Sequence, residues 1–228
     1  MLKELKRRVA AANRGLVTTG LVTLTWGNAS GIDRQKGLVV IKPSGVPYDE
    51  LGPECMVVVD LDGRLVEGKL KPSSDTPTHL ALYRAFQSIG GVVHTHSSHA
   101  TMFAQARREI PCLGTTHADH FHGPVPVTRA LDEREVAENY EGNTGQVIVE
   151  RFCGLDPEAM PAVLVAGHAP FTWGGSAEKA LENSVALEAV AEMVLGTWSI
   201  DRSVAELEPW VLEKHYQRKH GPAAYYGQ

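Results

Sequence analysis

Apolar residues recur along this chain with two different periods, which predict a mixture of helices and strands. Helical spacing, as in Leu2, Leu5 and Val9, marks segments whose apolar side chains share one face. Short valine- and isoleucine-rich runs bounded by glycine, proline or aspartate instead predict strands. The expected helices are residues 2–15, a helix that starts at Ser74 or Asp75, and residues 97–107, 178–195 and 206–218. The expected strands are residues 22–32 (interrupted by a turn at 26–28), 38–42, 91–96, 125–129, 146–150 and 162–166, with a hairpin over 56–67 that turns at Asp62-Gly63.

This order of elements predicts an α/β fold in which helices flank a central sheet, antiparallel or mixed. No repeat, low-complexity tract or long linker divides the chain, so we expect one domain over residues 1–228. The hydrophobic fraction of 43% and charged fraction of 21% are ordinary values for a soluble protein. The net charge of −5 lacks the basic excess that is typical of nucleic-acid binding.

The sequence predicts no signal peptide or membrane span, because its apolar stretches are shorter than the ~20 residues that cross a bilayer. Its three cysteines, Cys55, Cys112 and Cys153, are scattered and form no Cys-x-x-Cys pair. That pattern predicts neither a disulfide framework nor a thiolate zinc site. We therefore expect a cytoplasmic protein with free thiols and with no membrane or nucleic-acid partner.

The main chemical signal is a pair of histidines, His94 and His96, on one predicted strand. Side chains alternate along a strand, so both imidazoles face the same way and can share a metal ion. His168 follows the apolar run 162–166, and Asp75 could add an oxygen ligand. Such a donor set suits Zn²⁺ better than Mg²⁺ or Ca²⁺. Taken singly, the histidines are also compatible with polar strand ends or loops, and Asp75 with a helix N-cap.

A second group of histidines, His117, His120 and His122, surrounds Asp119 on a loop flanked by glycine and proline. This group ranks second as a metal site and first as a source of acid–base groups, because neighbouring histidines could tune the pKa of Asp119. A solvated aspartate on a loop would fit the same local pattern.

Three short segments, Gly27-Asn28, Ser44-Gly45 and Ser73-Ser74, contain small or polar residues whose backbone N–H groups can approach an anion. The last of them precedes a predicted helix, whose N-terminus favours negative charge. Lys42 could add a cation. Each segment alone is typical of a turn, and together they favour an anionic substrate. No nucleotide-binding glycine motif is present.

These motifs, in this order, resemble the class II aldolase family of the fuculose-phosphate aldolase type, and the resemblance runs from end to end. It is carried by residues 25–30 (TWGNAS), 41–46 (IKPSGV), 71–79 (KPSSDTPTH) and 93–97 (VHTHS). Residues 115–119 (TTHAD), 214–216 (KHY) and 224–228 (AYYGQ) are similar to the epimerase branch of the family.

The resemblance implies a single α/β domain around a largely antiparallel sheet, assembled as a homotetramer with active sites between neighbouring subunits. It implies one Zn²⁺ per subunit, replaceable by Mn²⁺ or Co²⁺, with a sugar phosphate as substrate. The implied zinc ligands are Asp75, His94, His96 and His168, and the implied phosphate contacts are Gly27, Asn28, Ser44, Gly45, Ser73 and Ser74. The implied acid–base pair is Asp119 and Tyr226, with His215 in support.

The implied reaction interconverts L-ribulose 5-phosphate and D-xylulose 5-phosphate by cleaving and re-forming the C3–C4 bond, as used in arabinose or ascorbate catabolism. In aldolases of the family, a catalytic glutamate occupies the position of Asp75. The shorter aspartate favours an epimerase over an aldolase, which is the nearest competing interpretation. The motifs are also compatible with a non-catalytic metal-binding or scaffold protein of this fold, or with a dehydratase acting on thiosugar phosphates.

Overall fold

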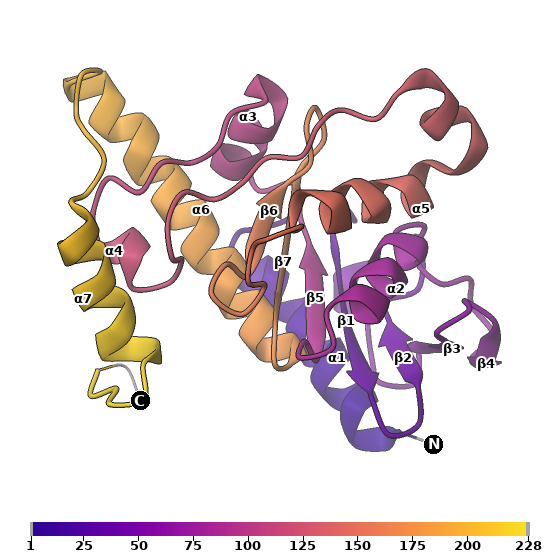
Figure 1. The fold of residues 1–228 in the computed structure, drawn as a ribbon. Helices are drawn as coiled ribbons and strands as arrows, with labels where there is room; N and C mark the ends of the chain where they lie inside the picture. The colour runs from indigo at the N-terminus through magenta and orange to yellow at the C-terminus, as the bar shows by residue number, and fades with distance from the viewer. Residues whose placement is uncertain (1, 227–228) are drawn as a thin grey trace.

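The computed structural model describes residues 2–226, and their seven strands form one antiparallel sheet. The strand order is β4-β3-β2-β1-β5-β7-β6 (Figure 1). The strands are β1 (Asn28–Asp33), β2 (Leu38–Ile41), β3 (Val57–Asp60), β4 (Leu65–Glu67), β5 (Gly91–His94), β6 (Ala162–Leu164) and β7 (Pro170–Gly174). The helices are α1 (Lys3–Thr18), α2 (Thr76–Ala85), α3 (Ser98–Ala106), α4 (Thr115–Ala118), α5 (Glu133–Arg151), α6 (Ala177–Ile200) and α7 (Pro209–His220), with a 3₁₀ turn η1 (Tyr48–Glu50).

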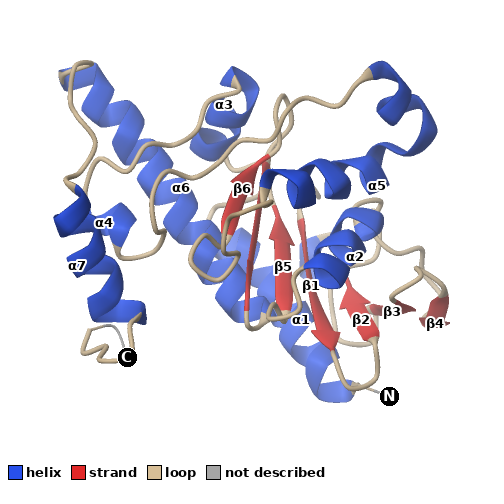
Figure 2. Ribbon diagram, viewed as in Figure 1, coloured by secondary structure: helices blue, strands red, loops and turns tan. Residues whose placement is uncertain are grey.

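Helices cover both faces of the sheet (Figure 2). Alternate strand residues point to opposite sides, and apolar residues on each side form a core with the helices there. Val40 and Val93 belong to the core on the α1 face, together with Val9 of that helix. Their strand neighbours Val39 and Val92 belong to the larger core that includes α2 and α5. The fold class predicted from the sequence, an α/β fold with a largely antiparallel sheet, is therefore confirmed.

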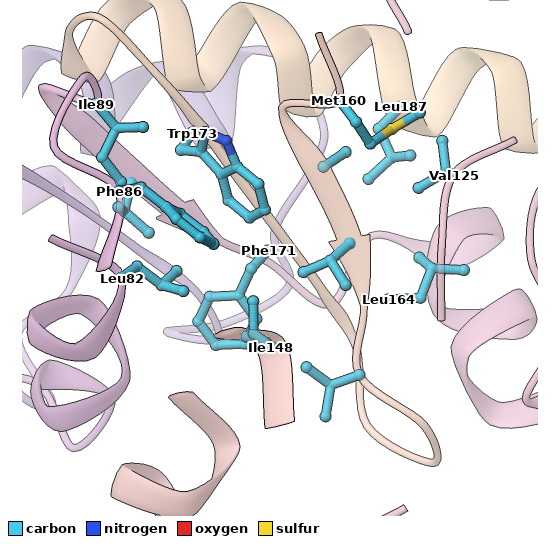
Figure 3. Close-up of a cluster of buried hydrophobic side chains, with 14 of the residues drawn as sticks. Leu82, Phe86, Ile89, Val125, Ile148, Met160, Leu164, Phe171, Trp173 and Leu187 are labelled. Atoms are coloured by element: carbon cyan, nitrogen blue, oxygen red, sulfur yellow. The ribbon is translucent and has the colours of Figure 1, made fainter. Parts of the chain in front are cut away.

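Aromatic side chains fill the centre of the larger core (Figure 3). The rings of Phe86 and Phe152 lie 5.2 Å and 5.0 Å from that of Trp173, centroid to centroid. The Trp173 indole N–H donates to the carbonyl oxygen of Pro157 at 2.8 Å, so its one polar atom is satisfied. Trp173 lies on β7 and pairs in register with Val92 of β5. This packing fixes β5 and β7 relative to each other. Of the candidate site residues, His94 is the last residue of β5, and His168 lies just before β7.

Most of the predicted elements are confirmed, and the first helix continues past Gly15 to Thr18. The hairpin over 56–67 forms from β3 and β4, with Gly63 at a φ of 83° in its turn. The strand expected over residues 22–32 begins only at Asn28, because residues 22–27 form turns and irregular structure. No helix among the described residues has the length and apolar character needed to cross a bilayer.

The predicted strand at residues 146–150 is wrong, because this β-branched run lies inside α5. The helix starts with a capping box in which Asp132 and Glu135 satisfy each other's backbone N–H groups. Gly145 then lets α5 approach α2 closely: a Cβ at this position would lie 2.5 Å from the Cβ of Ala81. Tertiary packing against α2 decides the structure here, and local β-propensity does not.

The predicted strand at residues 125–129 is also wrong. Val125 and Val127 make only isolated bridges, to Ile110 and Leu164 respectively. Conversely, the sequence pattern does not predict β7, because proline usually argues against a strand. Here Pro170 is the first residue of β7, a position where proline is tolerated. The pattern does not predict the short helix α4 or the first half of α5 either.

Candidate active site

A cavity of about 610 Å³ opens where β1, β5, α2, α5 and the loop between β6 and β7 meet. It contains residues from every motif of the metal and phosphate predictions. The lining residues are Thr25, Trp26, Gly27, Asn28, Lys42, Pro43, Ser44, Gly45, Ser73, Ser74, Asp75, His94, His96, Tyr140, Glu141 and His168. Segments that are far apart in the sequence thus form one site.

Three histidines in this cavity form a compact nitrogen cluster. One ring nitrogen from each of His94, His96 and His168 lies within 4.8 Å of those of the other two. His94 ends β5, His96 follows two residues later, and His168 lies on the loop between β6 and β7. In residues 2–226 no other group of three or more histidine, cysteine or acidic side chains is arranged in this way.

Hydrogen bonds engage the Nδ1 atoms of two of these three rings. The Nδ1 of His94 lies 3.0 Å from the carbonyl oxygen of Pro170, which can only accept, so Nδ1 carries the proton. The His94 ring also stacks on Phe171, with centroids 4.2 Å apart. The Nδ1 of His168 lies 3.3 Å from the hydroxyl of Tyr140. Partners of this kind leave Nε2 lone pairs for a metal.

The donor chemistry of this cluster fits a zinc ion. The Nε2 atoms of His94 and His96 are 3.2 Å apart, and two nitrogens of a tetrahedral zinc shell are separated by about 3.3 Å when Zn–N is 2.0–2.1 Å. Burial lowers the pKa of His96, and neighbouring His94 adds to the effect. Burial, together with the neighbouring His94 and His96, lowers the pKa of His168 to about 4. Neutral imidazoles are the form that binds metal.

Asp75 occupies the N-cap position of α2, yet its side chain makes no capping hydrogen bond. Its Oδ2 instead accepts from the Nδ2 of Asn28 at 2.6 Å. Burial raises the pKa of Asp75, but His94, His79 and the Asn28 hydrogen bond outweigh burial and hold the pKa below its usual value. The carboxylate lines the cavity but is not part of the described histidine cluster.

The three small-residue segments all line this cavity, and their N–H groups fall into two kinds. The N–H groups of Ser44 and Ser73 donate to the carbonyl oxygens of Lys71 and Lys42, so they tie two segments together. Those of Gly27, Gly45 and Ser74 donate to no acceptor in the described part of the chain. Gly45 has a φ of 70°, which favours glycine, and a Cβ there would meet nothing within 4 Å. The unpaired N–H groups can receive an anion.

Lys42 is a buried cation beside these N–H groups, with a side chain only 3% exposed. Its Nζ donates to the Pro43 carbonyl oxygen at 3.4 Å and lies 4.9 Å from the centre of the Tyr48 ring. No acidic side chain pairs with it among residues 2–226. Burial lowers the pKa of Lys42. A buried ammonium without a counter-charge favours an anionic ligand in the cavity.

The predicted acid–base residues form a separate cluster between α4 and α7. Asp119 accepts two hydrogen bonds from Arg218, at 3.0 Å and 2.8 Å, and its Oδ1 lies 3.2 Å from the Nδ1 of His215. The Arg218 guanidinium lies 4.2 Å from the centre of the Tyr226 ring. Partial burial raises the pKa of Asp119, but Arg218 and His215 outweigh it and the net pKa is lowered. Asp119 is therefore an ionised acceptor at neutral pH.

The histidines around Asp119 point to other partners. His117 lies 2.8 Å from the Gly123 carbonyl oxygen, His120 lies 3.3 Å from Lys219, and His122 lies 2.8 Å from Glu213. Burial lowers the pKa values of His117 and His120 to about 4. No three of these groups converge on a common point in the described residues.

The two clusters do not meet within one chain. None of the residues that line the 610 Å³ cavity comes from α4, α7 or the C-terminal segment. Figure 1 shows α4 and α7 on the opposite side of α6 from β1, β5 and α2. The structure thus brings together all the predicted metal and phosphate residues in one place, and all the predicted acid–base residues in another.

Among the residues that sequence reasoning missed are Tyr140 and Glu141 in the cavity and Arg218 beside Asp119. Tyr140 and Glu141 enter the cavity just after Asn139, whose φ of −165° and ψ of 75° break the helical path of α5. No local pattern announces that break. Arg218 could have been found, because it lies three residues after His215 on the same predicted helix and therefore on the same face.

Comparison with known proteins agrees with this geometry. Residues 7–195 match the family model described as the class II aldolase and adducin N-terminal domain. The chain therefore belongs to the class II aldolase family.

Among its relatives, the L-ribulose-5-phosphate 4-epimerases UlaF of Salmonella paratyphi B and Salmonella typhi are each 53% identical over 227 residues, 100% of both chains. A solved structure of L-fuculose 1-phosphate aldolase superposes with a TM-score of 0.80 at 25% identity, over 94% of this chain and 95% of that one.

Proposed function

We propose that this protein is a zinc-dependent epimerase that interconverts L-ribulose 5-phosphate and D-xylulose 5-phosphate at C4. The observation that carries the proposal is the shared cavity, in which a three-histidine cluster lies beside an anion site with a buried, unpaired lysine. The 53% identity to enzymes named for this reaction supports the substrate. Asp75, where aldolases of the family carry glutamate, supports the epimerase.

His94, His96 and His168 would hold the zinc ion, with Asp75 as the oxygen donor; the same donors accept Mn²⁺ or Co²⁺. A bound ion at this position supplies Lewis acidity to the substrate oxygens next to the C3–C4 bond. The free N–H groups of Gly27, Gly45 and Ser74, the Asn28, Ser44 and Ser73 side chains and the Lys42 ammonium would bind the C5 phosphate. The substrate is thereby held at both ends.

The acid–base residues Asp119 and Tyr226 move the protons. One of the two takes the proton of the C4 hydroxyl, the C3–C4 bond breaks, and the electron pair stays on C3. The aldehyde fragment turns its other face while Lys42 and the N–H groups keep its phosphate bound. The bond re-forms, and the other residue protonates the new C4 oxygen. Two groups are needed because the hydroxyl lies on opposite sides in the two epimers.

We further propose that the active site is shared between copies of the chain in a homotetramer, since the two clusters are apart within one copy. Helix α7 supports this arrangement because it has no buried residue. Trp210 on this helix is 73% exposed, and Ile200 at the end of α6 is 88% exposed. Tyr226 is 48% exposed, so about half of its surface is open to a second copy. Apolar groups of this size are commonly covered in an oligomer.

The free cysteines Cys55, Cys112 and Cys153 fit a reducing compartment, so we place the protein in the cytoplasm. A role in arabinose or ascorbate catabolism would follow from the reaction.

A coupled assay tests the proposed reaction. The zinc-loaded protein is incubated with L-ribulose 5-phosphate, D-xylulose 5-phosphate is followed enzymatically, and metal content is measured on the same sample. We expect turnover that depends on zinc. Absence of turnover in fully metallated protein would refute the epimerase, and release of dihydroxyacetone phosphate from a ketose 1-phosphate would indicate an aldolase instead.

Asp119→Asn tests the acid–base assignment. The amide keeps the shape of the side chain but cannot take a proton, so epimerisation should fall about 10²–10⁴-fold. Zinc content should stay unchanged, because Asp119 is not one of the proposed zinc ligands. Wild-type activity in this variant would remove Asp119 from the mechanism.

A further inference from the structure

Tyr48 contacts two of the proposed anion-binding residues, although it does not line the cavity itself. It is the first residue of η1, and its side chain is buried in the core on the α1 face. Its hydroxyl donates to the carbonyl oxygen of Gly27 at 2.7 Å, and the carbonyl oxygen of Trp26 lies 3.2 Å from the same hydroxyl. The Nζ of Lys42 lies over its ring, 4.9 Å from the centroid. One side chain thus reaches both the Gly27 backbone and the Lys42 ammonium.

The hydroxyl of Tyr48 orients the backbone of Gly27. Carbonyl oxygens can only accept, so the tyrosine O–H is the donor. Burial raises the pKa of Tyr48, which keeps this hydroxyl protonated. No peptide bond in residues 2–226 is cis, and in a trans peptide the N–H points away from the carbonyl. Because the Trp26 carbonyl faces Tyr48, the Gly27 N–H points away from that hydroxyl, and this is the N–H left free for an anion.

The backbone at Gly27 needs an anchor of this kind. Its φ of 104° lies in the region that favours glycine, the residue with the most conformational freedom. No stiffer residue can take its place, because a Cβ here would lie 2.9 Å from the carbonyl oxygen of His94. Gly27 also precedes the first residue of β1, Asn28, so it lies outside the paired part of the strand. A neighbouring side chain must therefore supply the rigidity that the glycine lacks.

The ring of Tyr48 acts on Lys42 in a second way. The Nζ of Lys42 donates only a long hydrogen bond of 3.4 Å, to the Pro43 carbonyl oxygen, and pairs with no acidic side chain in the described part of the chain. An aromatic face attracts an ammonium without neutralising its charge. The ring can thus hold the lysine in place and leave its whole positive charge for an anion.

We infer that Tyr48 is a positioning residue for the anion-binding groups of the cavity: its hydroxyl orients the free N–H of Gly27, and its ring holds the Lys42 ammonium. Tyr48 touches no ligand and acts only through these two residues. The inference rests on the proposed phosphate site and extends it to a residue in the core behind the cavity.

Phosphate affinity measures this role directly. Inorganic phosphate is titrated into the zinc-loaded protein by calorimetry. Tyr48→Phe removes only the hydroxyl, and its Kd for phosphate should rise about 3–10-fold, the usual effect of losing a hydrogen bond. Tyr48→Leu also removes the aromatic face and should raise the Kd by at least about 2-fold more. The zinc content of both variants should match the wild type, because neither change touches the histidine cluster.

Tyr83→Phe is the matched control, because it removes a buried tyrosine hydroxyl from the other core. That hydroxyl lies 2.8 Å from the Oγ of Ser30. Tyr83→Phe should lower the urea midpoint about as much as Tyr48→Phe does, yet change the Kd for phosphate less than about 2-fold. If it weakened phosphate binding as much as Tyr48→Phe, the effect would be a general loss of stability and the inference would be overturned. Wild-type phosphate affinity in Tyr48→Phe would overturn it as well.

Lys42→Met separates failure of the inference from failure of the proposed function. Removing the buried cation should raise the Kd for phosphate at least about 10-fold. An unchanged Kd in Lys42→Met would overturn the proposed phosphate site and the inference with it. Weaker binding in Lys42→Met beside unchanged binding in Tyr48→Phe would overturn the inference alone.

Steady-state kinetics give a second readout of Tyr48→Phe. The KM for L-ribulose 5-phosphate should rise by about the same factor as the Kd for phosphate, while kcat changes less than about 2-fold, since the phosphate is bound throughout the reaction. A fall in kcat with an unchanged KM would contradict a role in anion binding.

Discussion

The cavity at the ends of β1 and β5 and the cluster between α4 and α7 are built in opposite ways. The cavity lies on the central sheet, and its residues are cross-linked by hydrogen bonds such as those from Asn28 to Asp75 and from His94 to Pro170. The cluster at Asp119 lies under a helix, α7, that buries none of its own residues. Charged contacts with Arg218 and His215 hold it together.

This difference separates the two tasks of the proposed reaction. A metal and phosphate site needs rigid, pre-positioned donors, and a sheet core supplies them. Two of the three proposed acid–base groups, His215 and Tyr226, lie on a surface helix and on the C-terminal segment. Terminal segments are rarely held in place unless they dock on something. The comparison separates a region that the fold assembles within a single chain from one that, in the proposed homotetramer, would act at a contact between chains.

The largest expected effect is the loss of the metal. His96→Asn should abolish stoichiometric zinc binding and lower epimerase activity by more than about 100-fold, since loss of a mere partner of a ligand already costs 10–100-fold. His122→Gln, a histidine of the other region, serves as the control and should retain zinc. Zinc content by atomic absorption and the coupled assay give the two readouts, and retention of zinc by His96→Asn would contradict the assignment.

Mixing two inactive variants tests whether the two regions meet between copies. Chains with His96→Asn keep an intact Asp119 cluster, and chains with Asp119→Asn keep an intact metal cavity. In oligomers assembled randomly from equal amounts, about one quarter of shared sites contain both intact regions. We therefore expect recovery of roughly a quarter of wild-type activity on co-refolding. No recovery, with mixed oligomers confirmed by native mass spectrometry, would show that each chain acts alone.

A smaller effect is expected at Tyr140, whose hydroxyl lies 3.3 Å from His168. Tyr140→Phe removes only that oxygen, so zinc affinity should fall about 10-fold through the loss of a partner that orients the imidazole. Tyr216→Phe makes the same chemical change on α7, and zinc affinity should then match the wild type. Chelator competition measures the zinc affinity of both variants. If Tyr140→Phe bound zinc as tightly as the wild type, the Tyr140 hydroxyl would have no role in orienting His168.

The smallest effect concerns the stability of the Asp119 cluster and its dependence on pH. The folded-state pKa of Asp119 is lowered from 3.8, so its ion pair with Arg218 stabilises the fold above that value. This contribution is lost as the pH falls through the lowered pKa. Arg218→Gln should therefore lower the urea midpoint equally at pH 7 and pH 5, and the difference should shrink below pH 3.8. A difference that grows in acid would contradict this linkage.

Local patterns in the sequence predicted most of the sheet and the long helices, and they failed where tertiary contacts override propensity. The β-branched run at Val147 and Ile148 has the composition of a strand, but its packing against α2 makes it helical. The kink at Asn139, which places Tyr140 in the cavity, has no local signature. The sequence places Asp75 at the start of a helix and leaves a capping role open. The structure shows that its side chain makes no capping hydrogen bond and instead accepts one from Asn28.

Local patterns in the sequence determined part of the chemistry available to this protein, namely two histidines on one predicted strand face and a lysine beside small residues, because strand and helix periods are properties of the local backbone. The acid–base set of Asp119, His215 and Tyr226 followed from the resemblance of whole motifs to a family. The tertiary structure decided which of these groups meet. It joined His168 to His94 and His96 through the pairing of β5 with β7, and it placed Asp119 and Arg218 in a separate cluster. Such contacts depend on the packing of the whole core, which no short stretch of sequence encodes.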